Sequence, residues 1–146
     1  MEIKFTKLNE NAVSPQRATD EAAGYDLSAV VEQSELFLSP QESKMISTGI
    51  AVEIPRGYVG LLFGRSGLGC KENLRLANCV GVIDSDYRGE IKVCLYNDSS
   101  TKTNVIKNGT RIAQLVIVPH LSVEMVEVEE LSNTVRGEGG FGSTGQ

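Results

Sequence analysis

The chain has 146 residues, of which 40% are hydrophobic and 23% charged, and its formal net charge is −5. This length and balance predict one globular domain. The acidic charge disfavours a protein that coats nucleic acid, because such binding relies on Lys and Arg side chains to neutralise phosphates. No apolar run approaches the ~20 residues of a membrane span. The N-terminus lacks the pattern of a signal peptide, so we expect a cytoplasmic protein, or a nuclear one in a eukaryote or its virus.

Hydrophobic residues recur with a period of two along the chain, which is typical of β-strands. Ile3 and Phe5 alternate with polar residues, and 61–63 form a continuous apolar run of strand length, suited to burial on both faces. The only plausible helix follows Ser66 for a turn or two, toward Asn73. Turn residues recur at short intervals, as in Pro-Arg-Gly and Asn-Gly, which favours an all-β sandwich or barrel.

The segment 81–91, GVIDSDYRGEI, places two carboxylates and an aromatic ring between two apolar stretches. This pattern predicts a β-hairpin whose turn is Arg88-Gly89. Asp84 is the candidate for chemistry, whereas Asp86 is expected to form the turn or to pair with an Arg. Taken without its context, such an acidic turn is more often a solvated loop than a catalytic site.

The second half of the chain predicts two further strands and a tail. The run 115–118 is suited to a buried strand, and Val123, Met125 and Val128 alternate with glutamates as in a half-buried one. From Arg136 the composition changes, because five of the last ten residues are Gly. We therefore predict a domain over 1–135 and a flexible segment over 136–146 that orders over a ligand.

Five segments, in this order, resemble the five motifs of the trimeric dUTP pyrophosphatases (dUTPases): AAGYDLSA at 22–29, GRSGLG at 64–69, GVIDSDYRGEI at 81–91, RIAQLVI at 111–117 and RGEGGFGSTG at 136–145. The resemblance implies a jelly-roll-like, distorted β-barrel of the β-clip type. It also implies Mg²⁺-dependent hydrolysis of dUTP to dUMP and pyrophosphate, which keeps uracil out of DNA and supplies dUMP for thymidylate synthesis. The expected partner is a second and third copy of the chain, in a homotrimer whose active sites are shared.

The resemblance also implies roles for residues around 81–91. Asp84 resembles the catalytic aspartate, whose carboxylate deprotonates the water that attacks the α-phosphate. Tyr87 resembles the ring that packs under the deoxyribose and leaves no room for a 2′-hydroxyl. Uracil is read mainly by main-chain groups of this segment. The residues expected to contact uracil or deoxyribose are Asn78, Gly81, Ile83, Tyr87 and Lys92, with Phe141 of the tail stacking over the base.

The other motifs correspond to phosphate, metal and lid residues. Asp26 resembles the aspartate that holds the water shell of Mg²⁺, an outer-sphere role that suits an ion which keeps its waters. The phosphate-binding residues implied are Arg65, Ser66, Gly67, Gln114 and Arg136, and the lid residues are Gly140, Gly142 and Ser143. The chain departs from the family at Gly64 and Gly69, where Pro and Ala are common. Thr110 replaces a frequent Asp, so an ion pair near the phosphates is expected to be absent.

Two other functions remain open at this point. A dCTP deaminase shares the scaffold and the Arg-Ser segment, but it carries a glutamate in a different setting and is usually longer. A nucleotide sensor that binds partner proteins is the alternative from a different class. The complete tail and the 81–91 segment favour plain dUTP hydrolysis.

Overall fold

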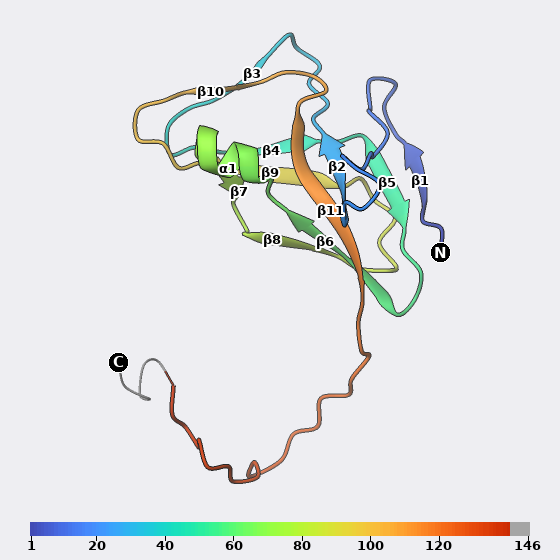
Figure 1. The fold of residues 1–146 in the computed structure, drawn as a ribbon, viewed down its shortest axis with the longest axis vertical. Helices are drawn as coiled ribbons and strands as arrows, with labels where there is room; N and C mark the ends of the chain where they lie inside the picture. The colour runs from blue at the N-terminus through green and yellow to red at the C-terminus, as the bar shows by residue number, and fades with distance from the viewer. Residues whose placement is uncertain (141–146) are drawn as a thin grey trace.

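The computed structural model describes residues 1–140, which contain eleven β-strands and one short helix (Figure 1). The all-β prediction is confirmed. The elements in chain order are β1 (Lys4–Lys7), β2 (Gly24–Ser28), β3 (Leu36–Leu38), β4 (Ser43–Ser47), β5 (Ile50–Glu53), β6 (Tyr58–Phe63), α1 (Ser66–Glu72), β7 (Leu74–Leu76), β8 (Val80–Ile83), β9 (Lys92–Asn97), β10 (Asn104–Ile106) and β11 (Arg111–Pro119). No helix among these residues is long and apolar enough to cross a membrane.

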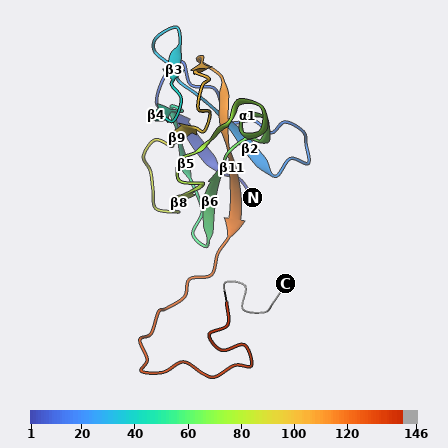
Figure 2. The same ribbon diagram turned by 90° about the vertical axis from the view of Figure 1, so that its left-hand side faces the viewer.

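The chain beyond β11 leaves the sheets and runs away from them (Figures 1 and 2). The strand predicted around Val123 and Val128 is wrong for the single chain, because residues 120–140 contain no strand. Their apolar side chains meet solvent instead: Met125 is 91% and Leu131 85% exposed. A strand needs a neighbour for its backbone N–H and C=O groups, and no strand of residues 1–140 pairs with this segment.

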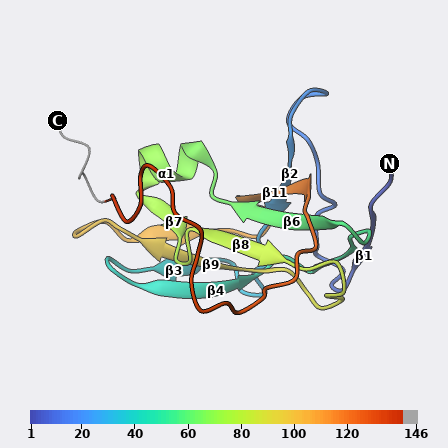
Figure 3. The same ribbon diagram turned by 90° about the horizontal axis from the view of Figure 1, so that it is seen from below.

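The strands form four antiparallel sheets. The largest has the order β2-β11-β6-β8, and the next has the order β4-β9-β7. β1 pairs with β5, and β3 with β10. Figure 3 shows the two larger sheets as layers, one above the other. Among the described residues the sheets surround a shared core but do not close into a hydrogen-bonded barrel. The predicted barrel is therefore an open arrangement of sheets around one core.

The core lies between these sheets and consists mainly of Leu, Ile and Val side chains that alternate along the strands. The largest side chains with almost no exposure are Leu27, Leu38, Ile46, Ile50, Ile54, Leu76, Ile91, Val93, Leu95, Ile106 and Ile112. The predicted burial of 61–63 and 115–118 on both faces is wrong in part. In β6 Leu62 is buried, whereas Leu61 and Phe63 are half-buried. In β11 Leu115 is buried, whereas 116–118 are half-buried. β6 has sheet neighbours on both edges but full cover on one face only.

The helix confirms the sequence prediction for 66–73. Residues Ser66–Glu72 form a single short helix, and Asn73 ends it with a left-handed backbone, φ 54°. Asn is among the residues that adopt this conformation at a helix C-terminus most readily. The helix therefore connects the end of β6 directly to β7.

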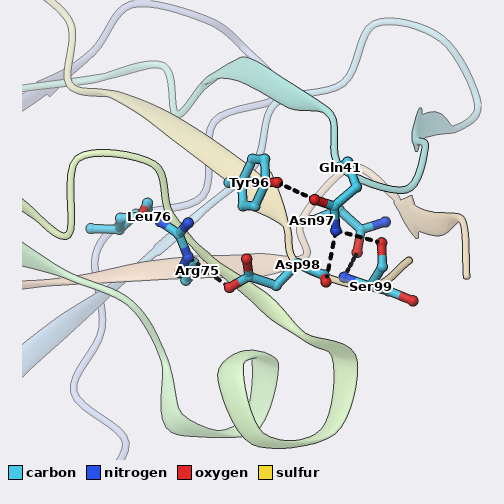
Figure 4. A network of polar contacts seen from close by, with 7 residues as sticks. All are labelled: Gln41, Arg75, Leu76, Tyr96, Asn97, Asp98 and Ser99. Atoms are coloured by element: carbon cyan, nitrogen blue, oxygen red, sulfur yellow. Dashed lines mark hydrogen bonds and ion pairs between the residues drawn. The ribbon is translucent and has the colours of Figure 1, made fainter. Parts of the chain in front are cut away.

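A polar network holds β7 and β9 beside the neighbouring loops (Figure 4). Arg75 donates to the Asp98 carboxylate at 2.6 Å and lies over the Tyr96 ring, and hydrogen bonding to Asp98 raises the pKa of Arg75 above its usual value. The Tyr96 hydroxyl donates to Gln41 at 2.7 Å. The amide of Asn97 is buried and donates to the carbonyl groups of residues 38, 39 and 102. Each buried polar group thus has its partner, and β7, which leads into β8, is firmly placed.

Candidate functional site

Asp84 lies just after β8, in the connection that leads to β9. The predicted hairpin is wrong, because β8 pairs with β6 and β9 pairs with β4 and β7, in a different sheet. The connection of residues 84–91, called here the crossing loop, passes between the two sheets. Its turn is Ser85-Asp86, closed by the Tyr87 N–H donating to the Asp84 carbonyl at 3.2 Å, and not Arg88-Gly89. Asp86 is a turn residue, as expected.

The crossing loop is fastened at several points. The Arg88 guanidinium donates to the carbonyl groups of Ser85 at 2.7 Å and Tyr87 at 2.9 Å. At the far end, the N–H of Ile91 donates to the Ile50 carbonyl at 2.8 Å. These bonds join the loop to itself and to β5. A loop fixed in this way can hold Asp84 and Tyr87 in defined positions on a rigid scaffold.

Asp84 stands between two hollows in the surface. The smaller, of about 270 Å³, is lined by Ile83, Asp84, Tyr87 and Lys92, together with Met45, Val82 and Glu90. The larger, of about 900 Å³, shares Val82 and Asp84 and is otherwise lined by residues that include Arg56, Arg88 and His120. The carboxylate of Asp84 is exposed. The structure therefore brings four of the predicted nucleoside and catalytic residues together at one hollow, called here the nucleoside hollow.

Asn78 and Gly81 lie toward the other end of β8 and do not line the nucleoside hollow. Gly81 faces the neighbouring strand, where an added Cβ would come 3.0 Å from the Cβ of Leu62 and 3.7 Å from the amide nitrogen of Asn78. Gly81 thus permits close packing of β8 on β6. The Asn78 side chain is its neighbour at the start of β8.

A second group of predicted residues gathers around Asp26 on β2. One carboxylate oxygen of Asp26 accepts from Arg65 Nε at 2.9 Å, and the other accepts from Arg111 Nη1 at 3.0 Å. Asp26 lies opposite Gln114 in the β2–β11 register, and Gln114 Nε2 donates to the Gly64 carbonyl at 3.0 Å. This group, called here the arginine cluster, presents two guanidinium groups held by one carboxylate of which only 12% is exposed.

Ser66 and Gly67 begin α1 directly after Arg65, and no atom lies within 4 Å of where a Cβ on Gly67 would be. The surface beside the arginine cluster is therefore open at Gly67. Sequence reasoning missed Arg111, although it is the first residue of the RIAQLVI segment. It binds Asp26 beside the predicted phosphate residues. At position 110, where the absence of an Asp was expected to remove an ion pair, the Thr110 hydroxyl accepts from the Lys107 N–H in the preceding turn.

The nucleoside hollow and the arginine cluster lie at opposite ends of the β6–β8 pair. Phe63 faces Val80 at one end and Gly60 faces Ile83 at the other. Arg65 continues beyond the first end and Asp84 beyond the second. With about 3.3 Å per residue along a strand, the Cα atoms of Arg65 and Asp84 are roughly 20 Å apart. Neither side chain spans this separation, so Asp84 and Arg65 do not meet directly within one chain.

In Figures 1 and 2 the described chain after β11 leads away from the sheets. Arg136 Nε donates to the Gly139 carbonyl at 2.8 Å, and Gly140 lies in the same stretch. Phe141, Gly142 and Ser143 lie outside the described residues. The boundary at 135/136 stays a prediction.

The described residues contain no group of three or more His, Cys, Asp or Glu side chains arranged to hold a metal ion. Both carboxylate oxygens of Asp26 already accept hydrogen bonds from arginines. A divalent ion coordinated wholly by the protein does not fit this arrangement. The donor set fits an ion that keeps its own waters and is held mainly by substrate phosphates.

Comparisons with known proteins point to one family. The family model described as dUTPase matches residues 10–145. The deoxyuridine 5'-triphosphate nucleotidohydrolase of Nautilia profundicola is 49% identical over 146 residues, which is 100% of each chain. A solved structure of a mutant dUTPase from Staphylococcus bacteriophage 80alpha, with dUpNHpp, has a TM-score of 0.88 at 35% identity and covers 99% of both chains. A mutant dUTPase from phage phi11 of S. aureus has a TM-score of 0.81 at 32% identity and covers 91% of this chain and 100% of its own. The chain belongs to the dUTPase family.

Proposed function

We propose that this chain hydrolyses dUTP to dUMP and pyrophosphate, with Asp84 activating the water that attacks the α-phosphate. The observation that carries the proposal is the position of Asp84, an exposed carboxylate at the rim of the nucleoside hollow and on a loop fixed at both ends. A carboxylate is ionised at neutral pH and accepts a proton from water as the new P–O bond forms. The relative from phage 80alpha, solved with dUpNHpp, supports a nucleotide as the ligand.

The nucleoside hollow supplies the selectivity in this proposal. The Tyr87 ring packs against the deoxyribose, so a ribose 2′-hydroxyl meets the ring. Main-chain groups near Ile83 and Lys92, which line the hollow, read the uracil edge, and Gly81 and Asn78 assist from the start of β8, outside the hollow. Phe141, together with Gly140, Gly142 and Ser143, closes over the base as a lid, and such closure excludes water from the reaction.

The arginine cluster supplies phosphate binding in this proposal. Arg65 donates to phosphate oxygens, and Ser66 and the open backbone at Gly67 approach them closely. Asp26 orients the guanidinium of Arg65, as its 2.9 Å hydrogen bond supports. Gln114 contacts the phosphates or the attacking water, and Arg136 of the tail contacts the γ-phosphate.

Magnesium is the cofactor in this proposal. The relative from phage phi11 is described with a structural Mg(II) ion. When bound to the triphosphate, Mg²⁺ neutralises charge on the phosphate oxygens and restricts their arrangement. Asp26 would hold one of its waters in the outer sphere, while Arg65 and Arg111 bind the remaining negative charge.

We further propose that the working form is a homotrimer whose sites combine the nucleoside hollow of one chain, the arginine cluster of a second and the tail of a third. The roughly 20 Å between Asp84 and Arg65 within one chain supports this. So does the exposed apolar segment after β11, since an isolated chain leaves Met125 and Leu131 in water. In the cell, the reaction would keep uracil out of DNA and provide dUMP for thymidylate synthesis.

The test is the release of pyrophosphate and nucleoside monophosphate from dUTP, dCTP, dTTP and UTP in parallel, with Mg²⁺ and with a chelator. The proposal predicts rapid release from dUTP alone, with the rate falling steeply in chelator. Ammonia release from dCTP would replace it with the deaminase. Binding of dUTP without turnover of any substrate, by folded protein, would replace it with the nucleotide sensor.

A further inference from the structure

The Tyr87 ring rests on the residue two positions further along the crossing loop. A Cβ added to Gly89 would lie 2.6 Å from Tyr87 Cζ and 2.9 Å from Cε2, closer than real Cβ atoms approach other atoms. The backbone of Gly89 does not itself require glycine, because its φ is not among the positive values of the chain. The ring of Tyr87 is what excludes a side chain at position 89.

The phenol end of Tyr87 is held as well. Its hydroxyl donates to the main-chain carbonyl of Glu90 at 2.9 Å. The side chain of Glu90 is anchored in turn, because Oε1 accepts from the Gly49 N–H at 2.8 Å. The next residue, Ile91, is bonded on both sides: its carbonyl accepts from the buried Thr48 hydroxyl at 2.6 Å, and its N–H donates to the Ile50 carbonyl at 2.8 Å.

We propose that Gly89 and Glu90 are positioning residues that form a seat for Tyr87, and that this seat sets the discrimination between deoxyribose and ribose. The inference rests on the proposed role of Tyr87 at the nucleoside hollow. Tyr87 is 44% exposed, so packing against the core does not fix its ring. Exclusion by sterics requires a wall that does not yield, because a ring free to turn about χ1 makes room for one hydroxyl group. The glycine under the ring and the anchored carbonyl at its hydroxyl supply that rigidity.

The direct test is Gly89→Ala, which forces the ring from its seat. We expect kcat/KM for UTP relative to dUTP to rise at least about tenfold, while hydrolysis of dUTP persists. Gly69→Ala is the matched control, because a Cβ there would lie 3.9 Å from the nearest atom, the Leu74 carbonyl oxygen. It is expected to keep the discrimination of the native chain. Unchanged discrimination in folded Gly89→Ala would overturn the proposal.

Whether Gly89 acts through the ring is tested in a double-mutant cycle with Tyr87→Ala. Once the ring is absent, adding Gly89→Ala is expected to leave the UTP-to-dUTP ratio where Tyr87→Ala alone puts it. A further change of the same size as in the native background would mean that Gly89 acts through the general fold, and would overturn the proposal. If the native chain fails to hydrolyse dUTP, the proposed function is wrong. If the native chain is active and an active Gly89→Ala variant keeps the native selectivity, the proposed function stands and only the proposed seat is wrong.

Glu90 gives an independent pair of variants, which also serves if Gly89→Ala does not fold. Glu90→Gln keeps an oxygen that accepts from Gly49, so discrimination is expected to stay within about twofold of the native value. Glu90→Ala removes this anchor, and the ratio for UTP is expected to rise severalfold, as it is in Tyr87→Phe, which loses the hydroxyl bond. Equal discrimination in Glu90→Ala, Tyr87→Phe and the native chain would contradict the seat.

Discussion

Asp84 owes its accessibility to where β8 ends. The strand finishes at Ile83, and the turn at Ser85-Asp86 carries the chain away, which leaves the Asp84 carboxylate exposed between two hollows. Asp86, two residues later, shares the charge but lines only the larger hollow. The two carboxylates therefore form a natural comparison of the proposed catalytic residue with a turn residue.

Asp84→Asn is expected to reduce turnover of dUTP by roughly 10²–10⁴-fold, because the amide keeps the shape of the side chain and loses its basicity. Binding of dUTP, measured by calorimetry, is expected to change little. Asp86→Asn serves as the control, with a rate close to that of the native chain. An Asp84→Asn protein with a large fraction of the native rate would remove Asp84 from the role of base.

Cys79 has a backbone conformation that its side chain seldom adopts. It turns the chain between β7 and β8 with a left-handed φ of 62°, a conformation that Asn adopts more readily than other side chains. Cys79→Asn is therefore expected to raise the free energy of unfolding by about 0.5–1 kcal/mol. Urea denaturation measures this change. Cys79→Ser, which removes the thiol without favouring this backbone, is expected to give no such gain, and an equal gain would point to the thiol instead.

The sequence allowed Asp84, Tyr87 and Arg65 to be named as candidate site residues, because each lies in a recognisable motif. It did not allow the residues that hydrogen-bond to the site residues or hold the loop to be named. Arg111 holds Asp26 across 85 positions of sequence, and Glu90 holds Gly49 across 41. Contacts over such distances depend on how sheets meet, and local pattern contains no information about that.

Among the secondary-structure elements, the pattern of apolar residues predicted β1, β6 and β11, but it did not identify the strands that pair with them. Two apolar stretches around a turn look like a hairpin in sequence, yet β8 and β9 join different sheets. A connection between sheets and a hairpin have the same local composition. The same limit explains the segment around Val123 and Met125, whose alternation predicts a strand although the single chain offers it no neighbour.

Removal of residues 136–146 tests the role proposed for the tail. Deletion of 136–146 is expected to lower turnover by roughly 100-fold or more, because the proposed lid and the proposed contact of Arg136 with the γ-phosphate are both lost. The midpoint of thermal unfolding and the number of chains per particle, measured by light scattering, are expected to stay unchanged, since the described residues 136–140 belong to no strand. Normal hydrolysis by the shortened chain would show that the tail has no part in the reaction.

In the whole molecule, the β6–β8 pair separates the two groups of residues that we propose form one site. The nucleoside hollow lies beyond one end of the pair and the arginine cluster beyond the other. Heterologous contacts between identical chains close into a ring when the rotation allows it, and each contact then joins unlike surfaces. A symmetric ring therefore lets the hollow of one chain meet the cluster of the next.

The most direct test of a site shared between chains mixes two variants that are each expected to be inactive. Asp84→Asn and Arg65→Ala are refolded together in equal amounts, and dUTP hydrolysis is compared with that of each variant refolded alone. If each site takes Asp84 from one chain and Arg65 from another, random assortment makes about one quarter of the sites intact, and activity returns to about that fraction of the native value. If the mixture stays as inactive as its components while its chains do exchange, the site belongs to a single chain and the account is wrong.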